Sequence, residues 1–162
     1  MRTARKGTFT VVCCFLASAL LAILPLPDWL DLFRPSFPLL VVLFWAVALP
    51  DRYGSWSGWL LGLLLDVLRG TPLGMHALAL ALAGFAASRL SARMKIYPLP
   101  QQMLAVGVLA GMSVMVARMI GNMTDTTTAG LFTALLPVVT TAMLWPWASA
   151  FQDRLRRTAN VS

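Results

Sequence analysis

The chain has 162 residues, and its composition excludes an ordinary soluble domain. Apolar residue types make up 59%, charged types only 12%, and the mean hydropathy is +0.76. A soluble domain carries about 25% charged residues, so this chain has too few polar groups to cover a surface that faces water. We therefore interpret it as an all-α integral membrane protein. The net charge of +7 does not indicate nucleic-acid binding, because the basic residues are spread through short connectors and form no basic stripe.

Six apolar stretches follow one another along the chain and predict six helices in a single transmembrane domain. The expected helices cover residues 9–24, 35–49, 54–69, 73–90, 102–120 and 131–151. The first stretch follows three basic residues and resembles a signal peptide. It continues past the small residues at 17–19, however, so we interpret it as a retained helix.

The second and third stretches are short, since a membrane span usually needs about 20 residues. Pro35 and Pro38 can lie in the first turn of the second helix, where a missing N–H costs little. A hairpin that does not fully cross the membrane is the alternative. In the sixth stretch, Pro146 predicts a kink, and Trp145 and Trp147 are expected to anchor the helix at the membrane interface.

The basic residues predict how the six spans are oriented. With both termini on the inner side, ten of the thirteen basic residues also lie on that side, and two lie on the outer side. The inner ten are Arg2, Arg5, Lys6, Arg52, Arg89, Arg93, Lys95, Arg154, Arg156 and Arg157. Because basic residues concentrate in cytoplasmic loops, we expect six transmembrane helices with the N- and C-termini inside.

Glycines recur at intervals of four in the third and fifth expected helices. They are Gly54, Gly58 and Gly62 in the third, and Gly107 and Gly111 in the fifth. Each interval of four turns a helix by about 400°, so the glycines of one helix stay close to one face. Small residues at this spacing form a groove that lets another helix approach closely in lipid. The groove would serve either packing within the bundle or docking of a partner's helix.

An acidic residue, Asp66, continues the glycine series at the outer end of the third helix. An ionisable residue within a membrane segment indicates a functional site with a nearby partner. Arg118 of the fifth helix is expected at similar depth, and Arg69 lies one turn further along the same helix as Asp66. We predict an intramembrane polar cluster of Asp66, Arg69 and Arg118, which Arg34 could join. A purely structural ion pair that fixes helix register is the alternative.

The remaining candidate residues do not indicate catalysis. His76 is the only histidine, glutamate is absent, and Cys13 and Cys14 are neighbours within an apolar stretch. We expect His76 to cap a helix or to lie at the surface, and the cysteines to behave as apolar residues. No nucleophile elbow, phosphate-binding loop or dinucleotide fingerprint occurs in the sequence. The sequence therefore predicts a protein that is not an enzyme and needs neither cofactor nor metal.

The central third of the chain resembles the MreD family of rod shape-determining proteins. The resemblance is carried by an acidic, proline-rich first loop, "FRP" at 33–35, "ALP" at 48–50, Gly58, Gly62, Asp66 and "GTPLG" at 70–74. "LWPW" at 144–147 also matches, whereas much of the fourth and fifth helices is generic apolar sequence. Arg118 has no place in the family pattern.

The resemblance implies a component of the cell-wall elongation machinery in the bacterial inner membrane. The implied partners are MreC, the actin-like MreB, RodA and an elongation penicillin-binding protein, together with membrane lipid. The implied role is a scaffold that holds MreC and helps couple MreB to peptidoglycan synthesis. The implied fold is a compact six-helix bundle similar to the substrate-binding subunits of energy-coupling-factor vitamin transporters.

A vitamin-binding membrane subunit of such a transporter is the alternative function. It would need an outward-facing polar pocket, bounded by Arg34, Asp66, Arg69, His76 and Arg118. The helix that contacts MreC, and the role of the basic segment at the C-terminal end, stay open at this point.

Overall fold

The computed structural model describes residues 2–24, 35–124 and 131–158, and the regular secondary structure in these ranges is helical, with short connectors between the helices. Its helices are α1 (Arg2–Ile23), α3 (Phe37–Ala48), α4 (Ser55–Arg69), α5 (Met75–Met94), α6 (Leu99–Met123) and α7 (Leu131–Thr158). Each expected helix corresponds to one of these. The helices α5, α6 and α7 extend beyond the expected ranges at their C-terminal ends, whereas α3 is shorter than expected.

The connectors explain where several helices begin and end. Gly70 follows α4 with a φ of 64°, and Gly74 precedes α5 with a φ of 105°. Only glycine adopts this left-handed region without strain, so the two glycines of "GTPLG" set the tight turn between α4 and α5. Pro38 lies in the first turn of α3 and Pro100 in the first turn of α6, where proline costs no hydrogen bond.

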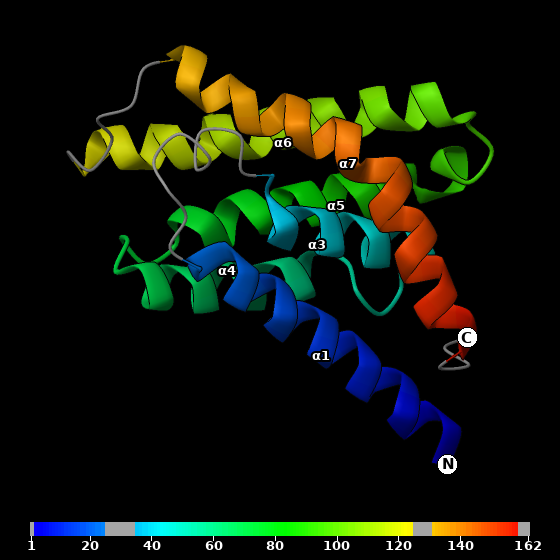
Figure 1. The fold of residues 1–162 in the computed structure, drawn as a ribbon. Helices are drawn as coiled ribbons and strands as arrows, with labels where there is room; N and C mark the ends of the chain where they lie inside the picture. The colour runs from blue at the N-terminus through cyan, green and yellow to red at the C-terminus, as the bar shows by residue number, and fades with distance from the viewer. Residues whose placement is uncertain (1, 25–34, 125–130, 159–162) are drawn as a thin grey trace.

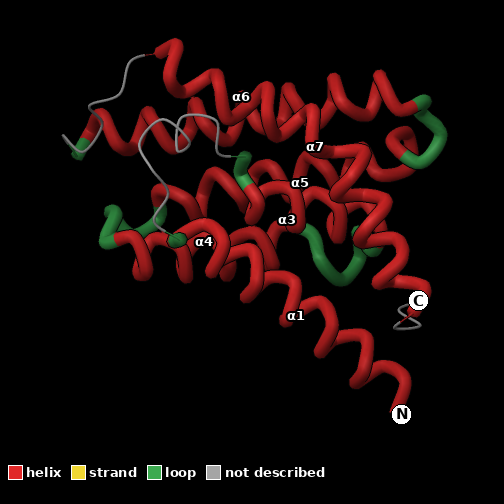
Figure 2. The backbone as a smooth tube through the Cα atoms, viewed as in Figure 1, coloured by secondary structure: helices red, strands yellow, loops and turns green. Residues whose placement is uncertain are grey.

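The helices lie roughly along one another, and consecutive helices run in opposite directions (Figure 1). The N-terminal end of α1 and the C-terminal end of α7 lie at the same end of the bundle (Figure 2). Helix α5 is central, since it packs against α3, α4 and α6. Helix α7 contains two prolines, Pro137 and Pro146, and it bends along its length (Figure 1), as a missing N–H inside a helix allows.

Helix α3 is the most enclosed element of the bundle. It contacts α1, α4, α5 and α7, and its residues from Pro38 to Ala46 are all buried. A helix that is apolar on every side is buried either in a protein core or in a membrane, and here neighbouring helices cover it. The short second stretch of the sequence is therefore a core helix, surrounded by longer helices, and its length does not have to match the thickness of a bilayer.

Large apolar side chains cover much of the outer surface of the bundle. Exposed examples are Phe9 on α1, Trp56 on α4, Leu104 and Met115 on α6, and Trp147 on α7. Among the described helices, α5 and α6 are long and apolar enough to cross a membrane, and the apolar segments Phe9–Ile23 and Phe37–Ala48 are shorter. Contiguous exposed apolar surface of this kind marks contact with lipid or with other proteins.

Candidate functional site

The Asp66 carboxylate lies at the start of α5, although Asp66 belongs to α4. Its side chain is fully buried. Oδ2 accepts hydrogen bonds from the backbone N–H groups of Gly74 (2.9 Å) and Ala77 (3.3 Å), and Oδ1 accepts one from the N–H of His76 (3.0 Å). The first N–H groups of a helix have no partner within it, and the helix dipole places partial positive charge there. Asp66 therefore caps α5 from the neighbouring helix.

Two side chains complete the surroundings of this carboxylate. The Thr71 hydroxyl donates to Oδ1 at 2.9 Å, and Nδ1 of His76 lies 2.8 Å from the same oxygen. Nε2 of His76 lies 3.2 Å from Nη1 of Arg69. An arginine can only donate, so Nε2 accepts and the proton of a neutral imidazole sits on Nδ1. In this arrangement, the guanidinium donates to the imidazole, and the imidazole donates to the carboxylate.

Arg69 also ties α1 to this cluster. Its Nη2 donates to the backbone oxygen of Ala22 at 3.0 Å, close to the end of α1. Hydrogen bonds from a charged guanidinium are stronger than those between neutral groups. We call Asp66, Arg69, Thr71 and His76 the Asp66 cluster, and it joins α1, α4 and α5 at one end of the bundle.

The described hydrogen bonds of Asp66 go to groups other than the two arginines that were predicted to pair with it. The neutral imidazole of His76 donates to Asp66 and lies between Asp66 and Arg69. Arg118 is partly buried on α6 and is not among the described contacts of Asp66. Arg34 lies outside the described residues. Pairing of Asp66 with Arg69 or Arg118 stays a prediction, and the backbone donors at the start of α5 are partners that an argument from depth does not reveal.

Sequence reasoning did not place Thr71 near Asp66, and it grouped His76 with Asp66 only in the pocket of the alternative function. The signal that could have found them is "GTPLG", in which two glycines reverse the chain within five residues. Such a turn brings the end of one helix next to the beginning of the following helix. An acidic residue in the last turn of α4 then faces the unpaired N–H groups of α5.

The glycines of α4 lie against α5. A Cβ atom added at Gly58 would overlap the backbone of Leu80, and one added at Gly62 would overlap the backbone of Ala77. At Gly54, an added Cβ would lie 3.3 Å from the backbone oxygen of Pro50. The absence of side chains at Gly58 and Gly62 is therefore used within the chain, where it lets α4 and α5 pack backbone against backbone.

The glycines of α6 have different surroundings. A Cβ atom at Gly107 would lie 3.6 Å from the Cβ of Ala142 on α7, which is an ordinary contact. A Cβ at Gly111 would meet nothing within 4 Å. Gly111 shares its helix face with Leu104, Val108 and Met115, because these residues are three to four positions apart. We call these four residues the α6 stripe.

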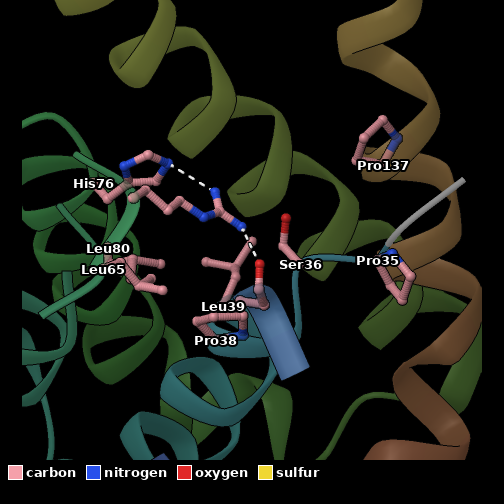
Figure 3. A pocket seen from close by; sticks show the side chains of 10 residues that line it. Pro35, Ser36, Pro38, Leu39, Leu65, His76, Leu80 and Pro137 are labelled. Carbon is pink, nitrogen blue, oxygen red and sulfur yellow. Dashed lines mark hydrogen bonds between the residues drawn. The ribbon is translucent and has the colours of Figure 1, made fainter. Parts of the chain in front are cut away.

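A cavity of about 370 Å³ opens beside the Asp66 cluster. Its walls come from α1, from α3 and the residues before it, and from α4, α5 and α7. The described lining residues are Ala22, Pro35, Ser36, Pro38, Leu39, Leu65, Arg69, His76, Leu80 and Pro137. Figure 3 shows His76 on one side of this cavity and Pro137 on the other, with Ser36 between them. Of the residues expected to bound a polar pocket, only Arg69 and His76 are among these.

A second polar network lies at the opposite end of the bundle. The Gln102 amide donates to the backbone oxygens of Met94 and Tyr97, both at 3.0 Å, and Nε1 of Trp145 donates to Oε1 of Gln102 at 3.0 Å. Trp145 is buried. The expectation that it anchors the helix at the membrane interface is therefore wrong, and the first tryptophan of "LWPW" instead fixes α7 to the connector between α5 and α6.

These features define a class: a helical membrane-type protein whose polar groups tie helices to one another. Within the described residues, no three histidine, cysteine or acidic side chains lie together as metal ligands. In a comparison with known protein families, residues 3–155 match the family described as rod shape-determining protein MreD.

The chain therefore belongs to the MreD family. It is similar to "Rod shape-determining protein MreD" of Haemophilus influenzae, with 26% identity over 156 residues, covering 94% of each protein. No solved structure matches the chain. Members of this family are generally non-enzymatic membrane proteins, so the match favours the rod-shape hypothesis over the vitamin-binding subunit.

Proposed function

We propose that this protein is a non-enzymatic scaffold of the cell-elongation complex in the bacterial inner membrane. It spans the membrane with six helices, holds the transmembrane helix of MreC, and helps to couple cytoplasmic MreB to peptidoglycan synthesis. Membership of the rod shape-determining MreD family supports this role. The alternating directions of the helices and the common end of the two termini (Figure 1) are compatible with both termini in the cytoplasm.

The open α6 stripe is the observation that carries the docking part of this proposal. The exposed fractions are 72% for Leu104, 66% for Val108 and 74% for Met115. Gly111 makes a notch in this apolar face, because nothing lies within 4 Å of its Cβ position. Helices associate in lipid through small residues that allow close approach, so the stripe fits a single partner helix.

The glycines of α4 are less suitable for a partner. Gly58 and Gly62 are buried against α5, and a second helix cannot occupy the same face. We therefore place the helix of MreC on α6. RodA and the elongation penicillin-binding protein would join the complex through MreC or through other exposed apolar faces of the bundle.

A bulky substitution at the notch tests this function. We expect Gly111→Leu to abolish co-purification of MreC and to fail to restore rod shape in cells that lack the native protein. A Cβ atom at this position meets nothing within 4 Å, so we expect little change in the melting temperature of the purified protein. Co-purification from membranes, cell-shape microscopy and thermal unfolding in detergent measure these results.

The matched control is Ala92→Leu, which adds the same bulk at an exposed position of α5 and should leave both MreC binding and cell shape unchanged. If Gly111→Leu still co-purifies with MreC at the wild-type level, the partner helix lies elsewhere. If Gly111→Leu binds MreC normally but the cells are round, the docking claim fails and the shape function depends on another surface.

A further inference from the structure

We propose that a second cavity, at the end of the bundle where α1 begins and α7 ends (Figure 2), binds a phospholipid whose headgroup carries both a phosphate and a primary ammonium. We call it the Asp153 cavity, and Lys95, Gln102, Ser149 and Asp153 are among the residues that line it. Its volume of about 330 Å³ lies within the range of small-molecule sites, about 300–1,000 Å³. The site is separate from the α6 stripe and goes beyond the scaffold function.

Two opposite charges in the wall of this cavity select the class of ligand. Lys95 directly follows α5, and Asp153 lies near the C-terminal end of α7. Both side chains are exposed, and in the part of the chain that the structure describes neither forms an ion pair or a side-chain hydrogen bond. A simple anion would be attracted by one charge and repelled by the other, and so would a simple cation. A ligand that carries both signs can be attracted by both.

The wall that carries these two charges is fixed before any ligand arrives. The amide of Gln102 donates to the backbone oxygen of Met94 at 3.0 Å, and Nε1 of buried Trp145 donates to Oε1 of Gln102 at 3.0 Å. Met94 directly precedes Lys95, and Trp145 lies about two turns before Asp153 on α7. These hydrogen bonds therefore tie the backbone beside the cation to the helix that carries the carboxylate. A site that is ordered in advance loses less conformational entropy on binding.

Hydrogen bonding specifies which kind of ammonium fits. Ser149 lies four residues before Asp153 on the same face of α7, and its hydroxyl donates to the backbone oxygen of Pro146 at 3.1 Å. Its oxygen can still accept a hydrogen bond. A primary ammonium has three N–H donors, so it can donate to the carboxylate and to this hydroxyl, whereas a trimethylated ammonium has none. Lys95 provides charge-assisted hydrogen bonds for the phosphate.

Apolar residues favour a lipid over a small zwitterion from solution. Phe44, Val47 and Leu99 line the cavity, and next to it 83% of Ile96 and 54% of Leu99 are exposed. Acyl chains gain free energy by covering such surface, and a free zwitterion with the same two charges does not. We therefore assign the site to a phospholipid with an ethanolamine-type headgroup.

Lipid competition on the full-length protein tests this assignment. The protein is reconstituted in bilayers with equal amounts of phosphatidylethanolamine, phosphatidylcholine and phosphatidylglycerol, and native mass spectrometry counts the lipids that it retains. Phosphatidylcholine has the same net charge but no N–H donor, and phosphatidylglycerol has the phosphate without the ammonium. We expect one retained phosphatidylethanolamine, preferred about tenfold or more over the other two, since hydrogen bonds to charged groups are among the strongest in proteins.

Two variants connect this preference to the cavity. Asp153→Asn removes the negative charge with little change in shape, and it should lower the retention of phosphatidylethanolamine about tenfold. Ser149→Trp fills the cavity and leaves both charges in place, and it should block retention. The matched control is Asp51→Asn, which removes an exposed acid of the α3–α4 connector that does not line the cavity and should leave retention unchanged. Thermal unfolding in detergent verifies that each variant is folded.

The proposal is overturned if the wild-type protein retains the three lipids equally, or if Ser149→Trp retains phosphatidylethanolamine as well as wild type. An equal loss in Asp51→Asn and Asp153→Asn would also overturn it, because retention would then follow net charge. Free phosphoethanolamine, titrated into delipidated protein, should leave the melting temperature unchanged. A stabilisation as large as that by the lipid would overturn the assignment to a lipid in favour of a soluble zwitterion.

Discussion

The single acid of α4 shows how a charged residue is accommodated in an apolar bundle. Asp66 is fully buried, and its two oxygens accept from three backbone N–H groups, one hydroxyl and one imidazole. Burial of a carboxylate is costly unless it is paired and hydrogen-bonded. Here the same groups that stabilise the carboxylate would otherwise be unsatisfied donors at the start of α5, so the capping benefits both partners.

Removing this acceptor should destabilise the fold strongly. We expect Asp66→Ala to cost at least about 3 kcal/mol of unfolding free energy, because each buried donor without a partner costs about 1–3 kcal/mol. Asp66→Asn should be nearly as harmful. Its amide has one oxygen and one NH₂ group, so it cannot accept from His76 on one side and from Gly74 and Ala77 on the other. Unfolding in mixed detergent–SDS micelles measures the loss.

Thr71 allows a milder form of the same test. Thr71→Val removes one hydrogen bond to Asp66 and should cost about 1 kcal/mol, while Thr71→Ser should keep the bond and most of the stability. If Asp66→Asn and Thr71→Val both unfold at the wild-type SDS concentration, the carboxylate does not cap α5 in the way described.

Sequence reasoning reached Asp66 and Arg69 but not the groups that contact the carboxylate directly. An acid in an apolar stretch is visible in the sequence, and it correctly indicates that a partner must exist. The partners found are mostly main-chain N–H groups, and these carry no side-chain signature. His76 was interpreted as a helix cap or surface residue, and it indeed lies at the start of α5, but its contact with Asp66 depends on the turn that Gly70 and Gly74 form.

At the scale of the helices, glycines spaced four residues apart have two different uses. On α4, Gly58 and Gly62 give α5 close access to the backbone. On α6, Gly111 faces open space. Spacing alone is the same in both cases, so it could not decide between internal packing and partner docking. The packing partner of α4 is α5, whose sequence carries little family-specific signal. The buried residues of α5 are mainly alanines, and these do not stand out in an apolar stretch.

Adding one methyl group to a glycine of each helix should distinguish internal packing from an open face. We expect Gly62→Ala to lower the unfolding free energy by about 1–3 kcal/mol, as overpacking of a tight contact does, because its Cβ would overlap the Ala77 backbone. Gly111→Ala should be neutral or slightly stabilising, since alanine is the better helix former. Thermal unfolding of the two purified variants compares them directly. Equal stability of both variants would contradict the close packing of α4 on α5.

The short second helix was the least predictable element. Its length left open whether it spans the membrane, as predicted, or belongs to a hairpin that does not fully cross. The structure encloses α3 among α1, α4, α5 and α7, and no face of its central turns is left to solvent or lipid. Proline in the first turn and the uniform apolar character could be recognised in the sequence. The neighbours that cover the helix could not, because they come from distant parts of the chain.

At the scale of the whole molecule, polar contacts concentrate at the two ends of the bundle. The Asp66 cluster joins α1, α4 and α5 at one end, and the network of Gln102 and Trp145 joins the α5–α6 connector to α7 at the other. The middle is apolar or glycine-rich. These contacts connect the helices at both ends, while large apolar side chains are exposed on the outer faces, which is compatible with the proposed scaffold role.

The most direct measurement of the central claim is site-specific photo-crosslinking in living cells. A photoreactive amino acid is placed at Val108 or Met115 on the α6 stripe, and at Leu60, an exposed residue of α4, as the matched control. The account predicts crosslinks to MreC from the two α6 positions and none from Leu60. Crosslinks from Leu60, with none from Val108 or Met115, would contradict it.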